Sequence, residues 1–455
     1  GDHKLLKNYK LYLPYFFIIA IYMGLRINAL GGLTAKSNIE IITLNNYHIL
    51  INIFPIFFQY IKKLFFPVNL SAYYFFHPAY SIAEAKVLWG LLFTTIFVII
   101  LCLLKKKDRR LPFFCLSFIL LSLLPTFYLR GLAGYAFAER YLYLPSVGFV
   151  VLVSYLFKHG YRSLISKRNN RKWAIWCFGT FLSLIIISYS LATILRNPAW
   201  QNDYTLWKDV VQKSPDNPAA HYSLGTIYKD RGKITEAIKE YKTVLKLSSV
   251  YTKVKAHNNL GNIYSEEGRL DQAIYHFTKA IEINPVDAFT HNNLGLVYTR
   301  KGVLAEGITE YLKALQIKPD YPEAHYNLGL VYYENGMPDQ AIAEFKKALE
   351  VSTELNLTNP AHLAAIHKNL GIVYASKGLF DKSAIQFEKA LTITSDDADL
   401  HNRLGVIYAG KGTLNKAVAH FQNAVRINPK HKGAQNNLKR VIIMKQKSNT
   451  SNQFP

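Results

Sequence analysis

The chain has 455 residues, of which 50% are hydrophobic and 18% are charged, and its formal net charge is +24. This combination excludes a single ordinary soluble domain, and we interpret the chain as two unlike parts. Residues 1–195 carry 21 Lys and Arg against five acidic residues, a net charge of +16, whereas the remainder carries 33 against 25, a net charge of +8. Positive charge concentrated in the apolar part is typical of loops that flank membrane spans, not of a nucleic-acid groove.

Several apolar runs in the first part are long enough to cross a bilayer, which takes about 20 residues at about 1.5 Å per residue. A further apolar segment, 47–66, is broken by Pro55 and carries Lys62 and Lys63, so we expect it to be re-entrant or interfacial. The three cysteines all lie in apolar runs and indicate neither a disulfide framework nor a zinc site. We predict membrane spans at residues 11–29, 86–104, 111–129, 141–158 and 173–195.

The orientation of these spans follows from the short basic loops at 105–110 and 158–172, which should stay in the cytoplasm. The loop 130–140 then faces outward, as does everything after Arg196. Segment 67–85 must also lie outside, which requires that 47–66 does not cross. The second part of the chain is therefore predicted to lie in an extracytoplasmic space, outside a bacterial inner membrane or in the lumen of the endoplasmic reticulum.

The second part is a repeat array, marked by Leu-Gly pairs that recur at steps of 36, 34, 34, 42 and 34 residues. This spacing predicts six tetratricopeptide repeats, each made of two antiparallel helices. The fold class is thus all-α, a multi-span membrane domain (1–195) followed by an α-solenoid. We assign 196–220 to a linker and leading helix, 221–430 to the repeats, and 431–455 to a capping helix and tail. Eight extra residues near 352–359 should bulge from one turn. The Leu-Gly pairs begin at Leu224, Leu260, Leu294, Leu328, Leu370 and Leu404.

A column of histidines stands three residues before each of these leucines. Regularly spaced imidazoles suggest metal binding, but helices of successive repeats lie about 10 Å apart, too far for one ion to bind two of them. We therefore interpret the column as inter-repeat packing and predict no metal site. The histidines are His221, His257, His291, His325, His367 and His401.

A second column consists of asparagines directly before the leucines. An Asn amide both donates and accepts hydrogen bonds, so spaced amides on a concave surface would hold an extended polypeptide without reading its sequence. This column is similar to the asparagine ladder of the repeat array in O-linked N-acetylglucosamine transferase. Ser223 and Arg403 interrupt it, and the alternative is an exposed polar position with no ligand. The ladder consists of Asn259, Asn293, Asn327 and Asn369, and Asn437 continues it.

Three motifs resemble the transmembrane and tetratricopeptide-repeat O-mannosyltransferases, a family with the C-type glycosyltransferase architecture. They are AERYLYLPSVGF (138–149), YIKKLFFPVNLSAYY (60–74) and NPAWQNDYTLW (197–207). The resemblance implies sugar transfer from a polyprenyl-phosphate donor to a polypeptide held outside the membrane by the repeats.

The donor phosphate suggests a role for arginine at the outer membrane surface, because a guanidinium pairs with phosphate through two parallel hydrogen bonds. Arg140 is the first candidate and Arg130 and Arg26 are weaker ones, with Glu139 orienting the guanidinium. The alternative is that Arg140 anchors a helix end among interfacial tyrosines.

The chain departs from the family pattern in its acidic residues. The resemblance implies catalytic carboxylates in the first outward loop, often an adjacent acidic pair, yet residues 1–195 contain no such pair and the first in the chain, Glu266–Glu267, lies in the repeats. We therefore expect the catalytic acid to lie upstream of residue 1 and this polypeptide alone to be inactive in transfer. No cofactor is predicted beyond the lipid-linked donor. The competing interpretation is a non-enzymatic, membrane-anchored scaffold that collects partner proteins, whereas nucleic-acid binding is disfavoured.

Overall fold

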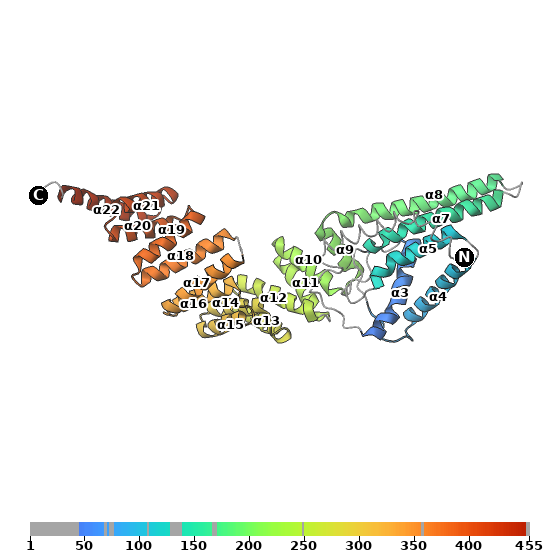
Figure 1. The fold of residues 1–455 in the computed structure, drawn as a ribbon, viewed down its shortest axis with the longest axis horizontal. Helices are drawn as coiled ribbons and strands as arrows, with labels where there is room; N and C mark the ends of the chain where they lie inside the picture. Colours follow the sequence, from blue (N-terminus) through green and yellow to red (C-terminus); the bar gives the residue numbers. More distant parts are fainter. Residues whose placement is uncertain are drawn as a thin grey trace, which may run out of the picture. The chain divides into compact units, whose positions relative to one another are not determined.

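The computed structural model describes residues 45–67, 71, 77–106, 109–127, 139–165, 171–247, 250–355 and 359–451, which are almost entirely helical and contain no strand. The predicted all-α fold class is thus confirmed. The chain divides into two compact units, Gly1–Ala256 and His257–Pro455, so the first repeat belongs to the unit of the membrane helices (Figure 1).

Among the described residues, three segments, all in the first unit, are long and apolar enough to cross a membrane: 85–105, 110–127 and 179–200. They overlap the predicted spans 86–104, 111–129 and 173–195. The predicted span 141–158 begins in a short 3-10 helix and continues into an α-helix that is not among these three segments, and the predicted span 11–29 lies outside the described residues. The helices of this region are α3 (Asn46–Phe65), α4 (Ala85–Lys106), α5 (Arg110–Leu123), η1 (Leu124–Phe127), η2 (Glu139–Leu142), α7 (Tyr143–Ile165), α8 (Arg171–Arg196) and η3 (Asn197–Trp200).

Helix α3 is continuous, so the expectation that Pro55 breaks this segment is wrong. Pro55 is buried inside the helix where α4 crosses it at Gly90. A Cβ atom on Gly90 would lie 2.5 Å from the backbone carbonyl carbon of Phe54, so only glycine permits this approach. Asn52, which is fully buried, exchanges hydrogen bonds of 2.8 and 2.7 Å with the backbone of Ala79. Packing and a satisfied polar group therefore hold α3 in the bundle.

Helices α3 and α4 run in the same direction. Ile51 packs with Val87 near their starts, and the Phe57 ring lies 5.1 Å from the Phe97 ring further along. The backbone N–H of Ile82 also donates to the hydroxyl group of Tyr47, 3.2 Å away. The two helix starts are therefore neighbours, and the chain between them must return to its starting end. That 47–66 makes no net crossing of the membrane stays a prediction.

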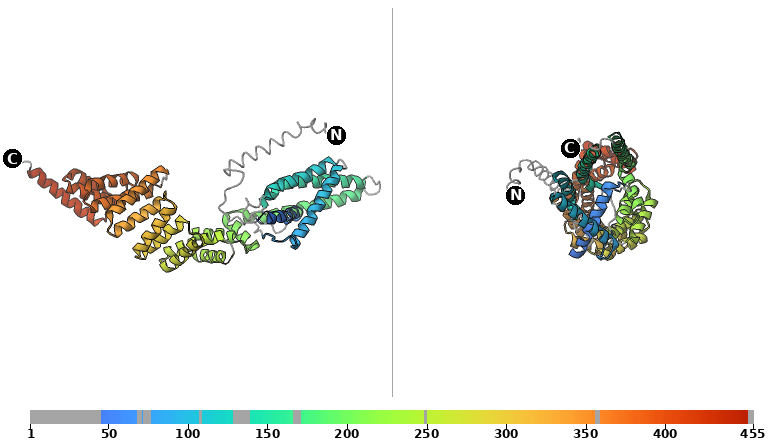
Figure 2. Two further views of the ribbon diagram at one scale, coloured as in Figure 1. Left: turned by 60° about the horizontal axis from the view of Figure 1, so that its bottom comes forward. Right: turned by 90° about the vertical axis from the view of Figure 1, so that its right-hand side faces the viewer.

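The repeat array consists of helix pairs that pack against each other (Figure 2). The short helix α9 (Asp203–Lys213) precedes the first pair, and α22 (Lys432–Ser451) follows the last. The pairs are α10 (Pro218–Asp230) with α11 (Ile234–Lys246), α12 (Val250–Glu266) with α13 (Leu270–Ile283), α14 (Ala288–Arg300) with α15 (Leu304–Ile317), α16 (Pro322–Glu334) with α17 (Pro338–Glu354), α18 (Pro360–Ser376) with α19 (Phe380–Ile393), and α20 (Ala398–Gly410) with α21 (Leu414–Ile427).

The glycine of each Leu-Gly pair faces an aromatic ring on the second helix of its repeat. A Cβ atom on Gly371 would lie 2.5 Å from the Phe387 ring, and one on Gly295 would lie 2.9 Å from the Tyr311 ring. Both rings are buried on the second helix of their repeat. The absent side chain thus makes room for the largest core residue of each repeat.

The insertion near 352–359 lengthens two helices, so the expected bulge is wrong for the residues that the structure describes. Helices α17 and α18 have 17 residues each, against 13 in α16 and 14 in α19. Ser352, the first residue of the added turn, is buried. Burial makes continued helix more favourable here than an exposed loop.

Candidate functional site

The turn that contains Glu139 and Arg140 lies at the end of the bundle where the repeats begin. Helix α7 packs antiparallel to α5, with Gly148 against Cys115, and antiparallel to α8, where the rings of Phe157 and Phe181 stack at 5.3 Å. The start of α7 and the end of α8 therefore share one end. The structure describes the backbone of Glu139 and Arg140 in η2 but not their side chains, and Arg130 and Arg26 lie outside the described residues.

The motif that joins the last membrane helix to the first repeat forms a compact joint. The guanidinium of Arg196 lies 2.7 Å from the carboxylate of Asp209 on α9 and 5.5 Å above the ring of Trp200. Asp209 also pairs with Lys213 at 2.8 Å, and Asn202 caps α9 in a reciprocal capping box. Charge pairing and capping thus fix how α8 leads into α9.

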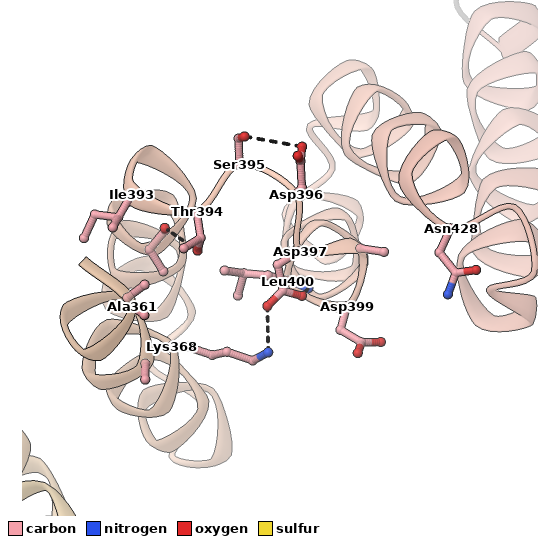
Figure 3. A pocket seen from close by; sticks show the side chains of 14 residues that line it. Ala361, Lys368, Ile393, Thr394, Ser395, Asp396, Asp397, Asp399, Leu400 and Asn428 are labelled. Atoms are coloured by element: carbon pink, nitrogen blue, oxygen red, sulfur yellow. Dashed lines mark hydrogen bonds and ion pairs between the residues drawn. The ribbon is translucent and has the colours of Figure 1, made fainter. Parts of the chain in front are cut away.

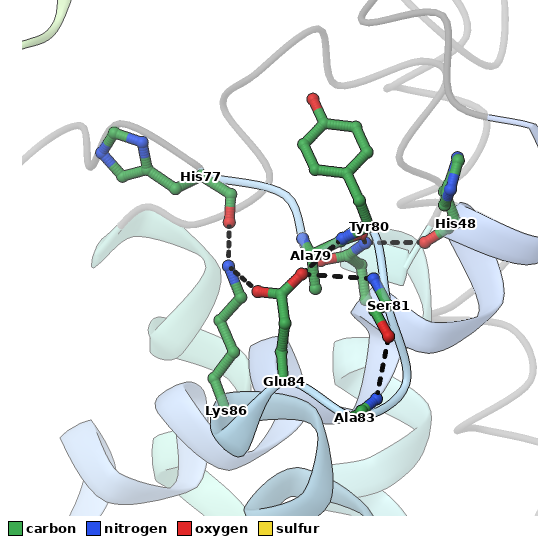
Figure 4. A network of polar contacts seen from close by, with 9 residues as sticks. His48, His77, Ala79, Tyr80, Ser81, Ala83, Glu84 and Lys86 are labelled. Atoms are coloured by element: carbon green, nitrogen blue, oxygen red, sulfur yellow. Dashed lines mark hydrogen bonds and ion pairs between the residues drawn. The ribbon is translucent and has the colours of Figure 1, made fainter.

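A polar network lies at the start of α4 (Figure 4). The Glu84 carboxylate accepts backbone hydrogen bonds from Tyr80 at 2.6 Å and Ser81 at 3.2 Å, which together with Lys86 lower the pKa of Glu84. Lys86 donates to the backbone carbonyl of His77. The His77 imidazole in turn lies 2.6 Å from the Asp216 carboxylate, between α9 and α10. This network connects the membrane part to the first repeat.

The histidine column links the two helices of each repeat, which differs from the predicted packing between repeats. In the repeats that begin with α10, α14 and α16, the imidazole Nδ1 contacts a glutamate on the second helix at 2.5–2.6 Å, and Nε2 contacts a proline carbonyl of the preceding turn at 2.9–3.1 Å. The pairs are His221 with Glu240, His291 with Glu310, and His325 with Glu344. Among the described residues no group of three or more metal-ligating side chains is arranged to hold an ion.

The other repeats replace the glutamate by a neutral partner. His367 contacts Gln386 at 2.7 Å, whereas His257 and His401 contact His276 and His420 through Nδ1 atoms 2.9 and 3.0 Å apart. Burial lowers the pKa of His367, His401 and His420. For His221 burial also favours the neutral form, but hydrogen bonds to Glu240 and the Pro215 carbonyl outweigh it and raise the pKa.

The asparagine ladder joins the first helices of successive repeats. The Asn327 side-chain amide donates to Asn292 Oδ1 at 3.0 Å, and the Asn369 amide donates to the Tyr326 hydroxyl at 2.9 Å. Asn293 donates to Asn262 at 3.3 Å. Asn437 in the capping helix repeats the pattern with Asn402, at 3.0 Å, and Asn259 also has a partner. The ladder residues are half-buried. Binding of polypeptide by these residues stays a prediction.

Sequence reasoning missed a pocket of about 750 Å³ between α18, α19 and the start of α20 (Figure 3). Its floor is lined by alanines of α18, and Lys368 reaches across to Asp397 at 2.7 Å. Burial alone would raise the pKa of Asp397, but Lys368 and the Leu400 amide hydrogen outweigh it and lower the pKa. Two features of the sequence could have indicated this pocket: the adjacent acidic residues Asp396 and Asp397, and Lys368 directly before Asn369. The ion pair joins two repeats and borders the ladder.

Family models for tetratricopeptide repeats match most of the second part of the chain. A model described as "TPR repeat" matches residues 225–266 and 297–336, and three described as "Tetratricopeptide repeat" match 254–287, 320–396 and 398–431. The predicted repeat array is therefore confirmed.

Curated relatives carry the name protein O-mannosyl-transferase. Protein O-mannosyl-transferase TMTC1 of Homo sapiens is 29% identical over 37% of this chain and 19% of its own length, and TMTC4 of Homo sapiens is 32% identical over 31% and 18%. Protein O-mannosyl-transferase F38B6.6 of Caenorhabditis elegans is 29% identical over 46% of this chain and 29% of its own length. The matched part of the chain thus spans between 18% and 29% of the length of these relatives.

Solved structures with a similar repeat region include the MamA protein and YrrB, the latter described as a TPR protein with an unusual peptide-binding site. Each is 25% identical, with a TM-score of 0.35, and they cover 39% and 40% of this chain and 93% and 91% of their own chains. The chain therefore combines candidate membrane helices with a tetratricopeptide-repeat array, and over the matched residues it is similar to the transmembrane and tetratricopeptide-repeat O-mannosyltransferases, as its motifs predicted.

Proposed function

We propose that this chain takes part in protein glycosylation outside the cytoplasm, in which a sugar passes from a polyprenyl-phosphate donor to a polypeptide held by the repeats. The observation that carries the proposal is its similarity to proteins named protein O-mannosyl-transferases, in a chain that has both candidate membrane spans and tetratricopeptide repeats.

The end of the helix bundle suits a lipid-linked donor. The phosphate of such a donor sits at the membrane surface, and Arg140 is in the turn that begins α7, at the same end as Arg196 and the joint to the repeats. A guanidinium there would bind phosphate through two parallel hydrogen bonds. Arg130 and Arg26 remain weaker candidates, with Glu139 orienting Arg140. The carboxylate that would activate an acceptor hydroxyl is not assigned to a residue of this chain.

The ladder suits an extended acceptor. Asn293, Asn327 and Asn369 place amides along the first helices of successive repeats, and each is held by a hydrogen bond to the preceding repeat. Held amides lose little further side-chain freedom on binding, which favours recognition of a peptide backbone. Asn259 belongs to the same set.

The donor site is tested by comparing Arg140→Lys and Arg140→Ala in the full-length protein, reconstituted in membranes and photo-crosslinked to a polyprenyl-phosphate sugar. Lysine keeps the positive charge but lacks the planar guanidinium that binds phosphate through two parallel hydrogen bonds, and alanine lacks both. Both variants should therefore lose most of the crosslinking. Arg162→Lys, at the other end of the same helix, is the matched control and should behave as the wild type. Equal crosslinking by all variants at equal expression would remove Arg140 from the donor site and make it a helix anchor.

The function itself is tested by mass spectrometry of O-linked sugars on exported proteins in cells that lack the gene. Loss of protein-bound hexose, restored by the wild-type gene, is the expected result. Unchanged glycans together with loss of bound partner proteins would instead support the membrane-anchored scaffold.

A further inference from the structure

Positive charge in the repeat array is concentrated at its carboxy-terminal end. Residues 400–455 contain ten Lys and Arg residues and no Asp or Glu, so their net charge is +10. The preceding residues 196–399 contain 23 basic and 25 acidic residues, a net charge of −2. An imbalance this sharp within one array indicates an anionic partner for its last repeat and capping helix.

The capping helix also exposes aliphatic side chains among these cations. Ile442, Ile443 and Met444 are consecutive and are 39%, 52% and 55% exposed. Lys439 and Arg440 directly precede Val441 and are exposed as well. Val441 itself is buried against the last repeat, so the helix is docked and its exposed residues are not a detached tail.

This exposed face is not built to receive another repeat helix. Lys439 stands 34 residues after Gly405, at the position where each repeat has a glycine against an aromatic ring. A lysine side chain there would block the close approach of a second helix.

We propose that α22, with the last repeat, docks onto an anionic lipid surface, a function independent of the proposed glycosylation. Lysine and arginine would pair with lipid phosphates while the aliphatic side chains enter the boundary between headgroups and acyl chains, a combination that membrane-surface helices use. A soluble polyanion would attract the same cations but has no use for three exposed aliphatic residues. The candidate membrane helices of the same chain would tether it to a bilayer.

The test uses the full chain held in phosphatidylcholine nanodiscs and mixed with separate sucrose-loaded vesicles. Co-sedimentation is expected with vesicles that contain phosphatidylglycerol, is absent with pure phosphatidylcholine, and weakens with salt. The double variant Lys439→Gln, Arg440→Gln should bind about tenfold more weakly or worse. The matched control Lys346→Gln, Lys347→Gln removes the same charge from exposed positions on α17 and should bind as the wild type.

The apolar contribution is tested by Ile442→Ser, Ile443→Ser, which should also weaken vesicle binding. If this variant binds normally while soluble polyglutamate competes fully, the partner is an anionic macromolecule and the lipid proposal fails. Equal binding to both kinds of vesicle, or no effect of the Lys439 and Arg440 substitutions, would overturn it too.

A second readout guards against misfolding of the variants. A fluorophore on Ile443→Cys, in an otherwise wild-type background, should be quenched by nitroxide-labelled lipids in the anionic vesicles. A fluorophore on the exposed Val286→Cys should not be quenched. Absence of quenching at residue 443 contradicts the proposal.

Discussion

The membrane helices and the repeats distribute the same residue types in opposite ways. On α8 the side chains of Trp173, Trp176 and Leu195 are 76%, 74% and 72% exposed, whereas in the repeats Phe345 and Phe387 are almost completely buried. Water drives apolar side chains inward in the array, but lipid gives no such drive. The length of the apolar runs therefore identifies the membrane helices in the sequence, whereas the regular spacing of residues identifies the repeats.

Close packing, in contrast, uses the same device in both regions. Gly90 lets α4 meet the backbone of α3, and Gly371 and Gly405 let first helices meet buried aromatic rings. Glycine thus marks the closest contacts whatever the solvent. The following predictions test how the membrane helices and the repeats differ in their surroundings and how far they share close packing at glycines, beginning with the largest expected effect.

The largest effect is expected in the membrane topology, because each loop should be labelled from only one side of the membrane. A single cysteine placed at residue 108 or 168 should react with a membrane-impermeant reagent only from the cytoplasm, and one at Asp203 only from the other side. Because His77 contacts Asp216, a cysteine at Ser81 should react from the same side as one at Asp203. Labelling of residue 330 from the cytoplasm would overturn the orientation and the idea of an extracytoplasmic acceptor.

In the bundle, Gly90→Ala should destabilise the protein by about 1–3 kcal/mol or more, because the added methyl group meets backbone atoms that cannot turn aside. Gly179→Ala on α8 is the control, since nothing lies within 4 Å of its added Cβ atom. Thermal unfolding in detergent measures both. Equal melting temperatures for the two variants would show that α3 and α4 are not in close contact.

In the array, Gly405→Ala should cost about 1–3 kcal/mol because its methyl group would lie 2.5 Å from the Phe421 ring. Gly410→Ala on the same helix has open space and should be neutral or slightly stabilising. Hydrogen exchange should show the loss mainly in α20 and α21, because repeats interact with their nearest neighbours. Uniform loss over distant repeats would contradict this local packing.

Joint replacement of Asn293, Asn327 and Asn369 by Ala should weaken binding of extended polypeptide. Since each amide also donates one bond between repeats, a further stability cost of about 0.5–1.5 kcal/mol per residue is expected. Asn292→Ala removes the acceptor of Asn327 but leaves the ladder amides, so it should cost stability without abolishing binding. Calorimetry with a peptide and thermal unfolding distinguish the two effects, and unchanged binding by the triple variant would make the ladder purely structural.

The smallest effect concerns pH. His401 and His420 have lowered pKa values, so the unfolded chain binds more protons, and α20 and α21 should lose stability as pH falls below about 6.5. His221 has a raised pKa, so its stabilisation is fully present below about 6.5 and is lost as pH rises through the raised value. Hydrogen exchange of α10 and α20 at several pH values measures the contrast. His420→Gln copies the His367–Gln386 pair and should reduce the acid sensitivity of α20.

Much of this fold could be predicted from the sequence, because long apolar runs and a 34-residue period are strong signals. The continuity of α3 through Pro55 could not, since it depends on Gly90 and on Asn52 finding Ala79, contacts far apart in the chain. The residues of the site were predicted as columns, but not their partners. The repeats differ in the partner of their histidine, which lies 19 positions further along the chain and is Glu240 for His221 but Gln386 for His367. The 34-residue period also does not predict the ion pair between Lys368 and Asp397.

The parallel arrangement of α3 and α4 has a consequence for how the protein enters the membrane. The stretch from the start of α3 to the start of α4 begins and ends at the same end of the bundle, so on the predicted topology the spans after it keep their orientation whenever α3 is inserted. The basic loops would then orient α4, α5, α7 and α8 without α3, and we expect α3 to join the bundle through its contacts with Gly90 and Ala79.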